Sequence, residues 1–573
     1  MRDLILFLAG FILQTTILTA QTQYPTGYFR SPIDFTPSLS GTFAEVRSSH
    51  FHSGIDYRTQ GVEGKPLYAA AEGFVSRIRI SPTGFGKAIY IEHPNGFTTV
   101  YAHVRNFIPR IQQYVVNEQY RRESFDVDLY PEPNTIKVEK GEIIAFGGNS
   151  GTSSGPHLHF EIRHTRNQNP VNPLLFGLNI HDDIPPVIQA VKVYPIGNYS
   201  TVNGQHNPVI FEATGNHGRY KLVNEKSIHV SGDFAIGIQA YDTHNHSNLR
   251  NGFKNLSIFI DNELSFQYRI NEFSFSETRY VNAVIDYEEF MRSKRRFIQT
   301  RVLPNNPLNI YPVVSQGGVF SFAGQGNHKV KIEVKDASGN TAILQFKIAT
   351  EQPTDFYATE SRDDKRSHFR FDQVNRYQTE LFVLEIPALA LYEDLLFEFG
   401  MEESALETVA PLFHVHNIYT PLHRSLTIAI KPEIKNADHL GKALVVRMDD
   451  KGEWVPEGGE YIDGYIKASA RAFGTFSLML DTIPPVILPV NIANNKTLGN
   501  QNGIRMKISD ALSGIKSYRG TMNGSWILMD YDPKNELLIY EIDARMQKGA
   551  NLFRLEVEDM VGNRSVYEAT LNL

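Results

Sequence analysis

The sequence contains no cysteine, which excludes disulfide bridges, a cysteine nucleophile and a lipid-bearing cysteine behind a leader peptide. Its domains must therefore be held together by core packing alone. A strong charge of one sign is also missing, since 56 Lys and Arg residues face 63 Asp and Glu residues for a net charge of -7. So mild a balance gives no reason to expect a nucleic-acid partner, and we expect none.

Long apolar runs are missing as well. The apolar run at residues 4–13 follows Arg2 and is interrupted by polar residues 14–16, so it is too short to cross a bilayer. This pattern is typical of a secretory signal peptide, which we place at residues 1–20. No later segment reaches the length of a membrane span. We therefore expect an exported protein whose mature chain has no transmembrane segment and works in the periplasm or the cell envelope.

The length and the composition predict several β-rich domains. A chain of 573 residues exceeds what one hydrophobic core usually supports. Its 27 Tyr, 36 Phe and 42 Gly favour sheets joined by tight turns, so we expect a mostly β protein.

Two pairs of similar strings divide the chain. The first pair, at residues 182–188 and 481–487, places two prolines ahead of an apolar stretch, as expected of a linker that opens a domain. The second pair, at residues 334–340 and 557–563, resembles a turn between two strands. We infer related β-sandwich modules at 183–350 and 481–573, which resemble immunoglobulin-like accessory domains.

The stretch between these two modules, residues 351–480, is expected to be a third β-rich module. Residues 425–430 alternate as in a half-buried strand, whereas residues 389–397 fit a strand or a helix equally well. Its fold stays open at this stage.

The region 25–180 carries three separated histidine motifs. The first is His52-Ser-Gly-Ile-Asp56, in which an imidazole and a carboxylate offer metal ligands. The second is Tyr-Ala-His103 at the end of a hairpin that turns at Asn95-Gly96, a dipeptide that favours tight antiparallel turns.

The third motif follows the glycine-rich loop 147–156 and reads His157-Leu-His159-Phe. In a strand, alternate side chains share a face, so the two imidazoles point into one cleft while the apolar residues enter the core. The loop also matches the GxSxG pattern of serine hydrolases around Ser153, but that motif needs a helix after it, and an alternating strand is expected here.

Other histidines serve as internal controls. The pairs His244/His246 and His414/His416 have the same spacing as the third motif but lack comparable companions, so we interpret them as surface or structural residues. We also give His50 and His93 no role in the site.

Taken in order, His52-x-Gly-x-Asp56, Tyr-Ala-His103 and Gly-Pro-His157-Leu-His159-Phe resemble the lysostaphin and LytM type of zinc endopeptidase. The resemblance covers about a quarter of the chain. It implies a compact, mostly antiparallel β metallopeptidase domain of the duplicated hybrid motif type at 25–180, followed by about three β-sandwich modules.

The same resemblance implies the ligands and the chemistry. One zinc ion is held by His52, Asp56 and His159, and a water in its open position is the nucleophile. His157 and His103 are the catalytic residues, with His157 as general base and His103 orienting the water or stabilising the oxyanion.

The expected function is hydrolysis of peptide cross-links or stem peptides of bacterial peptidoglycan, for wall remodelling. Two alternatives stay open, namely a non-hydrolytic wall-binding activator of other hydrolases, and adhesion through the C-terminal modules. The insertion at 104–140 is expected to border the substrate groove as a lid, a specificity wall or an inhibitory plug.

Overall fold

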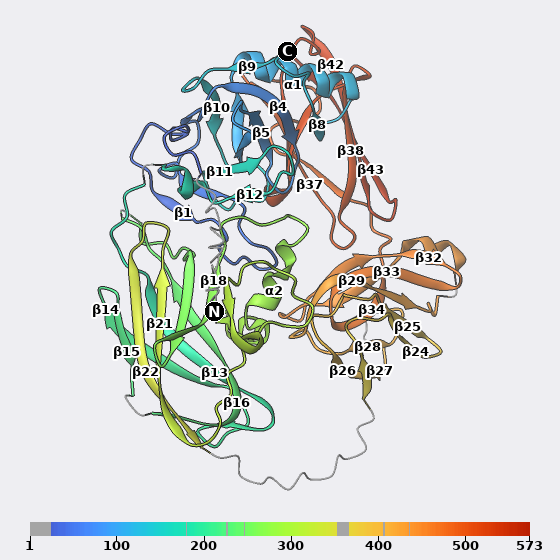
Figure 1. The fold of residues 1–573 in the computed structure, drawn as a ribbon. Helices are drawn as coiled ribbons and strands as arrows, with labels where there is room; N and C mark the ends of the chain where they lie inside the picture. Colours follow the sequence, from blue (N-terminus) through green and yellow to red (C-terminus); the bar gives the residue numbers. More distant parts are fainter. Residues whose placement is uncertain are drawn as a thin grey trace, which may run out of the picture.

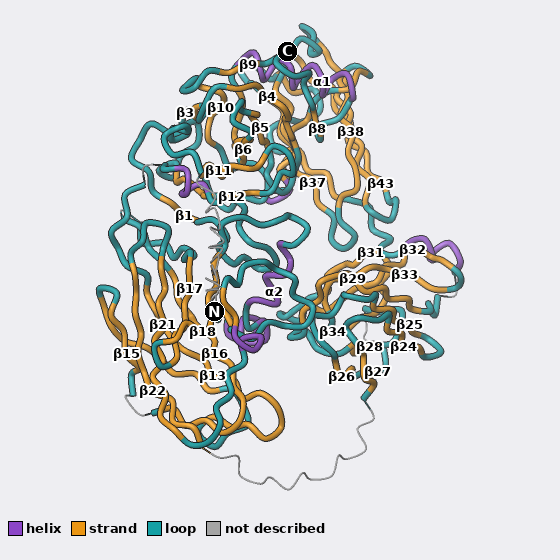
Figure 2. Tube along the Cα trace, in the orientation of Figure 1, coloured by secondary structure: helices purple, strands orange, loops and turns teal. Residues whose placement is uncertain are grey.

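The computed structural model describes residues 24–573 except 179, 225–226, 246, 352–365, 405–406 and 435. Strands make up most of the ordered elements (Figure 2), as the composition predicts. The signal peptide predicted at 1–20 lies outside the described residues. In the part of the chain that is described, no helix is both long enough and apolar enough to cross a membrane.

The first domain packs two antiparallel sheets around one core. The larger sheet has the order β1-β2-β11-β6-β5-β4-β8, with β12 beside β11 and β9 beside β4. Its strands are β1 (Leu39–Gly41), β2 (Ile55–Arg58), β4 (Gly73–Ile80), β5 (Lys87–Glu92), β6 (Phe97–Ala102), β8 (Val127–Leu129), β9 (Lys137–Val138), β11 (His157–His164) and β12 (Pro170–Val171). The smaller sheet contains β3 (Pro66–Tyr68), β10 (Ile143–Gly147) and β7 (Val104–Phe107).

The register of the larger sheet brings the three histidine motifs together. Strands β5 and β6 form the predicted hairpin, and Gly96 takes the positive φ of +81° that its turn requires. Strand β11 lies between β2 and β6, where His159 pairs with Asp56 on one side and with Ala102 on the other. Leu158 and Phe160 enter the core, so strand alternation leaves the histidines on the opposite face.

The next module, which ends at residue 351, consists of one ten-stranded sheet that encloses its own core. The order is β19-β16-β13-β14-β15-β22-β21-β17-β18-β20, and a further β16–β22 pairing closes part of it into a ring. Its elements are β13 (Val187–Val202), β14 (Val209–Asn216), β15 (Arg219–Leu222), β16 (Ile228–Tyr241), β17 (Asn255–Ile260), β18 (Glu263–Arg269), α2 (Val281–Val284), α3 (Tyr287–Ser293), β19 (Ile298–Gln299), β20 (Val313–Val314), β21 (Gly326–Lys335) and β22 (Thr341–Glu351).

The following module is a sandwich of two five-stranded sheets with a small two-stranded sheet beside them. Residues 389–397 contain a strand and no helix, which resolves the alternative left open. Its strands are β23 (Ser367–Phe369), β24 (Asn375–Gln378), β25 (Phe382–Ile386), β26 (Leu395–Phe397), β27 (Phe399–Glu402), β28 (Leu412–Val415), β29 (Pro421–Ile430), β30 (Ala443–Met448), β31 (Trp454–Gly458), β32 (Glu460–Ile462), β33 (Tyr465–Ala472) and β34 (Gly474–Leu480).

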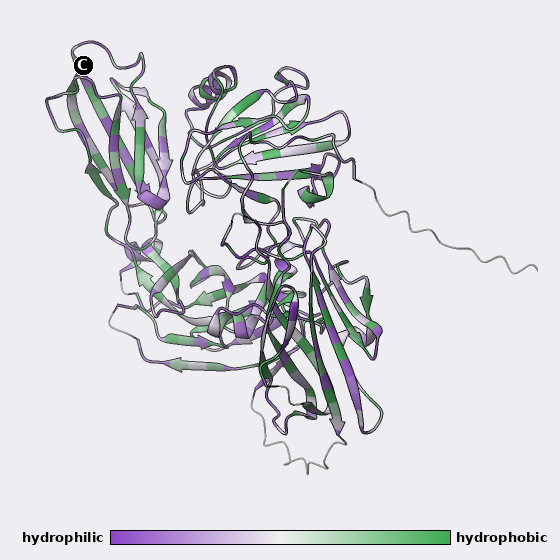
Figure 3. Cartoon of the chain, turned by 90° about the vertical axis from the view of Figure 1, so that its left-hand side faces the viewer, coloured by the Kyte–Doolittle hydropathy of each residue, from purple (hydrophilic) through white to green (hydrophobic). Residues whose placement is uncertain are grey.

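The last module is a sandwich of a four-stranded and a five-stranded sheet. Both Pro-Pro strings directly precede the first strand of a module, as predicted. Figure 3 shows how apolar and polar residues alternate along the strands. Its strands are β35 (Val486–Pro489), β36 (Lys496–Thr497), β37 (Gly503–Ser509), β38 (Ile515–Met522), β39 (Ser525–Trp526), β40 (Met529–Asp532), β41 (Leu537–Glu541), β42 (Ala550–Asp559) and β43 (Arg564–Asn572). Single 3₁₀ turns along the chain are η1 (Pro173–Phe176), η2 (Thr278–Tyr280), η3 (Ser315–Gly318), η4 (Ala437–Lys442) and η5 (Pro533–Asn535).

The segment that leads to His52 is packed against the module that contains β13 to β22, called the first accessory module below. The rings of Phe43 and Phe51 lie 5.3 and 5.6 Å from that of Phe273 and belong to the core of that module. The amide of Phe51 also donates a hydrogen bond to Oγ1 of Thr278 at 2.8 Å. The first accessory module therefore fixes the backbone next to a predicted metal ligand.

The insertion at 104–140 contains the longest helix among the described residues, α1 (Pro109–Arg122), which the sequence reasoning missed. It contributes to the contact between the first domain and the last module, which lie side by side in Figure 1 and are also joined outside the helix, for example by the ion pair of Lys87 with Asp530. Tyr120 donates a hydrogen bond to Oδ2 of Asp543 at 2.6 Å and accepts one from the amide of Leu528 at 3.3 Å. Its ring contacts the guanidinium of Arg545 at 3.4 Å and lies edge-on to Trp526.

This interface generates a first prediction. Tyr120→Phe removes the hydroxyl that bonds to a carboxylate across the interface, which costs about 1.5 kcal/mol. We expect roughly tenfold faster hydrogen–deuterium exchange in α1 and in β39–β40, measured by mass spectrometry. Tyr130→Phe is the control, because the Tyr130 side chain is largely exposed. Equal protection in Tyr120→Phe and in the wild-type protein would show that the hydroxyl does not hold the interface.

Candidate metal centre and active site

Three of the predicted site residues converge on one point at the centre of the larger sheet. Nε2 of His52 lies 3.0 Å from Oδ1 of Asp56 and 3.0 Å from Nδ1 of His159, and the last two atoms are 2.9 Å apart. All three side chains are buried. Asp56 and His159 come from the adjacent strands β2 and β11, and His52 from the loop before β2.

This triangle of donor atoms fits a divalent metal ion. Zn²⁺ prefers imidazole nitrogens and carboxylate oxygens at about 2.0–2.2 Å in a tetrahedron, whose corners are then about 3.3 Å apart. The observed separations are within a few tenths of an ångström of that value. Two nitrogens and one oxygen are also a donor set that zinc accepts while one position stays open.

Outer hydrogen bonds orient both imidazoles toward the triangle. Nδ1 of His52 donates to the carbonyl of Thr42 at 2.8 Å, and Nε2 of His159 donates to Oε1 of Glu161 at 2.8 Å. Because each of these ring nitrogens carries the proton that it donates, the opposite nitrogen is the one available to bind a metal ion in the triangle. Such partners set the tautomer of metal-ligating histidines.

Glu161 is a functional residue that the sequence reasoning missed. It is fully buried and, besides His159, it accepts hydrogen bonds from Ser53 and Arg163. Arg163 neutralises the carboxylate, which would otherwise be a costly buried charge. The sequence did contain a signal for this role: Glu161 follows His157 and His159 at alternate positions, which places all three side chains on the same face of β11.

The electrostatics of the cluster favour positive charge at the triangle. Burial opposes ionisation of Asp56, but His52 and His159 outweigh it and hold the pKa of Asp56 well below its usual value. Burial alone would lower the pKa of His159, whereas its hydrogen bonds to Asp56 and Glu161 raise it to about 9. The two carboxylates therefore create a site that stabilises a cation.

His157 and His103 lie beside the triangle as neutral imidazoles. Nδ1 of His157 donates to the carbonyl of Gly155 at 2.8 Å, and Nδ1 of His103 donates to the carbonyl of Ser150 at 2.9 Å. Their ring centroids are 4.8 Å apart, and Nε2 of His157 lies 3.7 Å from Oδ1 of Asp56. Burial lowers the pKa of both rings, for His103 to about 3, so each keeps an unprotonated Nε2.

The residues that received no role do not belong to the donor triangle. His50 is exposed, and the buried His93 bonds to the carbonyl of Glu72 and to Oγ1 of Thr99. After the GxSxG-like loop the chain continues as strand β11, so Ser153 lacks the following helix that a nucleophile elbow requires.

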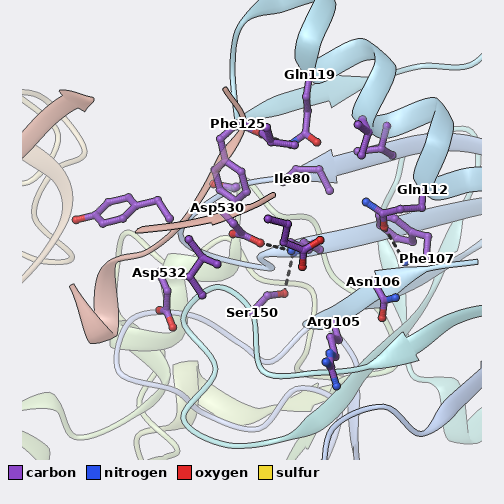
Figure 4. A pocket seen from close by; sticks show the side chains of 18 of the residues that line it. Ile80, Arg105, Asn106, Phe107, Gln112, Gln119, Phe125, Ser150, Asp530 and Asp532 are labelled. Carbon is purple, nitrogen blue, oxygen red and sulfur yellow. Dashed lines mark hydrogen bonds and ion pairs between the residues drawn. The ribbon is translucent and has the colours of Figure 1, made fainter. Parts of the chain in front are cut away.

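A cavity of about 700 Å³ lies between the first domain and the last module. Figure 4 shows Gln119 of α1, Ser150 of the glycine-rich loop and Asp530 of β40 around it. None of the five predicted site residues lines it, although the carbonyl of Ser150 binds His103. The helix of the insertion therefore borders this interdomain cavity, with the glycine-rich loop between it and the histidines.

Comparison with known families identifies the first domain. Residues 50–120 and 134–173 match peptidase family M23, and the match contains all five predicted site residues. The chain carries an M23 peptidase domain. The stretch 121–133, which includes β8, is left out of the M23 match and falls inside the predicted insertion. The module at 366–481 matches the Zu5-like domain, which gives a family to the stretch whose fold had been left open.

Relatives share mainly the M23 domain. The DD-carboxypeptidase/endopeptidase Mpg of Neisseria meningitidis is 32% identical over 183 residues, which cover 32% of this chain and 32% of that protein. The murein hydrolase activator NlpD of Salmonella dublin is 28% identical over 174 residues, or 28% of this chain and 39% of that protein. The match thus spans about a third of the length of these relatives.

Among solved structures, the catalytic domain of the prophage-encoded M23 protein EnpA from Enterococcus faecalis, determined as a mutant, is 24% identical, with a TM-score of 0.19. The similarity covers 26% of this chain and 96% of that domain.

Glu161 provides the prediction for this site. Glu161→Gln weakens the hydrogen bond that orients His159, so we expect about 10- to 100-fold lower zinc affinity in the folded protein. Competition with a chromogenic chelator measures the affinity. The control Glu92→Gln removes a carboxylate from strand β5 of the same sheet, away from the triangle. Unchanged affinity in Glu161→Gln would contradict the orienting role.

Proposed function

We propose that the protein is a zinc-dependent endopeptidase that hydrolyses peptide cross-links or stem peptides of bacterial peptidoglycan during wall remodelling. The observation that carries the proposal is the buried triangle of His52, Asp56 and His159 with the imidazoles of His157 and His103 beside it. The Mpg relative is named as a DD-carboxypeptidase/endopeptidase, which supports this substrate class. Export to the periplasm or cell envelope belongs to the same proposal.

In this proposal His52, Asp56 and His159 hold one zinc ion. When bound, zinc supplies a Lewis acid that polarises the scissile carbonyl and makes a water acidic enough to attack near neutral pH. His157 accepts the proton of the attacking water at Nε2, because its Nδ1 is committed to Gly155. The neighbouring His103, whose Nδ1 is committed to Ser150, offers its own Nε2 and orients the water or stabilises the oxyanion.

The second candidate function is activation of other wall hydrolases without hydrolysis. The NlpD relative, named as a murein hydrolase activator, favours it. Loss of metal ligands or bases would suit such a role, whereas this chain keeps all five residues in a converging arrangement. The two candidates therefore differ in whether the purified protein alone cleaves its substrate.

Digestion of purified cross-linked muropeptides tests the proposal directly. We expect the full-length protein to release un-cross-linked products, identified by mass analysis, and a zinc chelator to abolish the release. His159→Ala should lose both bound zinc and activity, because it removes a donor atom and leaves Glu161 without its partner. Intact substrate after digestion by zinc-loaded wild-type protein would favour the activator function.

The base assignment has a separate test. His157→Ala keeps the three donor atoms, so it should bind zinc normally while kcat falls about 10²- to 10⁴-fold. The pH profile of kcat should lose its acidic limb in this variant, since that limb reports the general base. His368→Ala, a change at an exposed histidine in the Zu5-like module, serves as control. If His157→Ala hydrolyses normally and His103→Ala does not, the roles of the two residues are reversed.

A further inference from the structure

A second cluster of buried ionisable groups lies at the start of the first accessory module. Asp182 belongs to the linker that follows the M23 domain, Asp242 follows strand β16, and Asp336 follows strand β21. The side chains of Asp182 and Asp242 are 1% and 2% exposed, and Asp336 is 3% exposed. Three carboxyl groups that are far apart in sequence are thus gathered out of solvent.

Two oxygens of this cluster have no hydrogen-bond partner. They are Oδ2 of Asp182 and Oδ1 of Asp242, both completely buried. Ligand atoms of Asp182, Asp242 and His244 lie within 4.8 Å of one another, and Asp336 lies against Asp182. Buried polar atoms are almost always paired, so two orphan carboxylate oxygens in one place indicate a missing partner.

That partner must be cationic. Among the residues that the structure describes, no Lys or Arg forms an ion pair with any of the three carboxylates. The imidazole of His244 lies 3.9 Å from oxygens of both Asp182 and Asp242, and Lys254 interacts with Asp336 without forming an ion pair. Burial and the neighbouring carboxylates of Asp336 and Asp182 raise the pKa of Asp242 to about 9. Either a proton or a metal ion has to offset this charge.

The last module offers an internal comparison. Asp481, Asp510 and Asp559 hold the equivalent positions, before the Pro-Pro string, after a strand and at the Gly-Asn turn, and their oxygens also converge. There, backbone amides satisfy the carboxylates: Ser513 donates to Oδ2 of Asp481 at 3.1 Å, and Gly514 donates to Oδ1 of Asp510 at 2.7 Å. The first module repeats the acidic arrangement but leaves the equivalent oxygens unpaired.

We propose that Asp182, Asp242 and Asp336, with His244 beside them, bind a divalent metal cation distinct from the one in the M23 domain. Carboxylate oxygens dominate the donor set, which makes Ca²⁺ the first candidate and Mn²⁺ the second. Asp182 lies in the linker, and Asn340 of the β21–β22 turn donates to its carbonyl at 3.1 Å. The cation therefore ties the end of the M23 domain to the first accessory module.

The test is titration of the full-length, zinc-loaded protein with CaCl₂ and, separately, MnCl₂. Isothermal calorimetry should show one additional ion bound in the wild-type protein. Asp242→Asn removes the negative charge of a carboxylate whose Oδ1 has no hydrogen-bond partner, with little change of shape, and should weaken binding at least tenfold. At a Ca²⁺ concentration about 100-fold above Kd, wild-type Tm should rise by about 5 °C, and this rise should vanish in Asp242→Asn.

Two further variants keep the outcome decisive. Asp182→Asn replaces Asp242→Asn if the latter does not fold. Asp510→Asn is the matched control in the last module and should bind the ion as the wild-type protein does. Binding of either ion that depends on Asp242 or Asp182 supports the site. The proposal is overturned if the wild-type protein binds neither ion, which would assign a proton to Asp242, or if only Asp510→Asn loses binding.

Discussion

The convergence of three donor atoms to within 3.0 Å of one another is the constraint on which the rest of the M23 domain depends. It requires β11 to lie between β2 and β6, because only that order places His159 opposite Asp56 and brings His103 beside His157. A shift of one residue in the β11 register would exchange the two faces of the strand and put both of its histidines into the core. Leu158 and Phe160, fully buried on the other face, oppose such a shift by their own burial.

The site is also held from outside its own domain. Thr42, which orients His52, donates a hydrogen bond from its hydroxyl to the carbonyl of Gly252 in the first accessory module at 3.1 Å. On the opposite side, Lys534 of the last module donates to the carbonyl of Ser153 in the glycine-rich loop at 3.2 Å. That loop supplies the carbonyls that set the tautomers of His103 and His157. The accessory modules therefore act on the geometry of the site as well as being separate folding units.

The sequence predicted those features that are encoded locally. The Asn95-Gly96 turn, the alternation along β11 and the Pro-Pro strings each depend on a few adjacent residues, and each was found where expected. Helix α1 was missed because only three of its residues, Ile111, Val115 and Gln119, are buried, and because its contacts with Asp543 and Arg545 come from a module more than 400 residues away. The role of Glu161 was missed for a related reason. A carboxylate on a strand shows no function in the sequence, and only the folded structure brings it against the ring of His159 and the guanidinium of Arg163.

The way in which the fold balances buried charges links the two proposed ion sites. Elsewhere in the first accessory module the buried ammonium of Lys192 is paired at 2.7 Å with both Asp286 and Glu289, so the fold can supply counter-charges from its own side chains. In the M23 domain Glu161 is likewise matched by Arg163, and Oδ2 of Asp56 accepts a hydrogen bond from Arg47 at 3.1 Å, while Oδ1 faces the donor triangle. The cluster around Asp182 departs from this rule, since no Lys or Arg among its described neighbours pairs with it. Backbone amides bond to Asp182 and Asp336 in the first accessory module as they do to Asp481 and Asp510 in the last, but Oδ2 of Asp182 and Oδ1 of Asp242 stay buried and unpaired. Leaving buried carboxylates unpaired costs several kcal/mol, and the proposed cation offsets that cost.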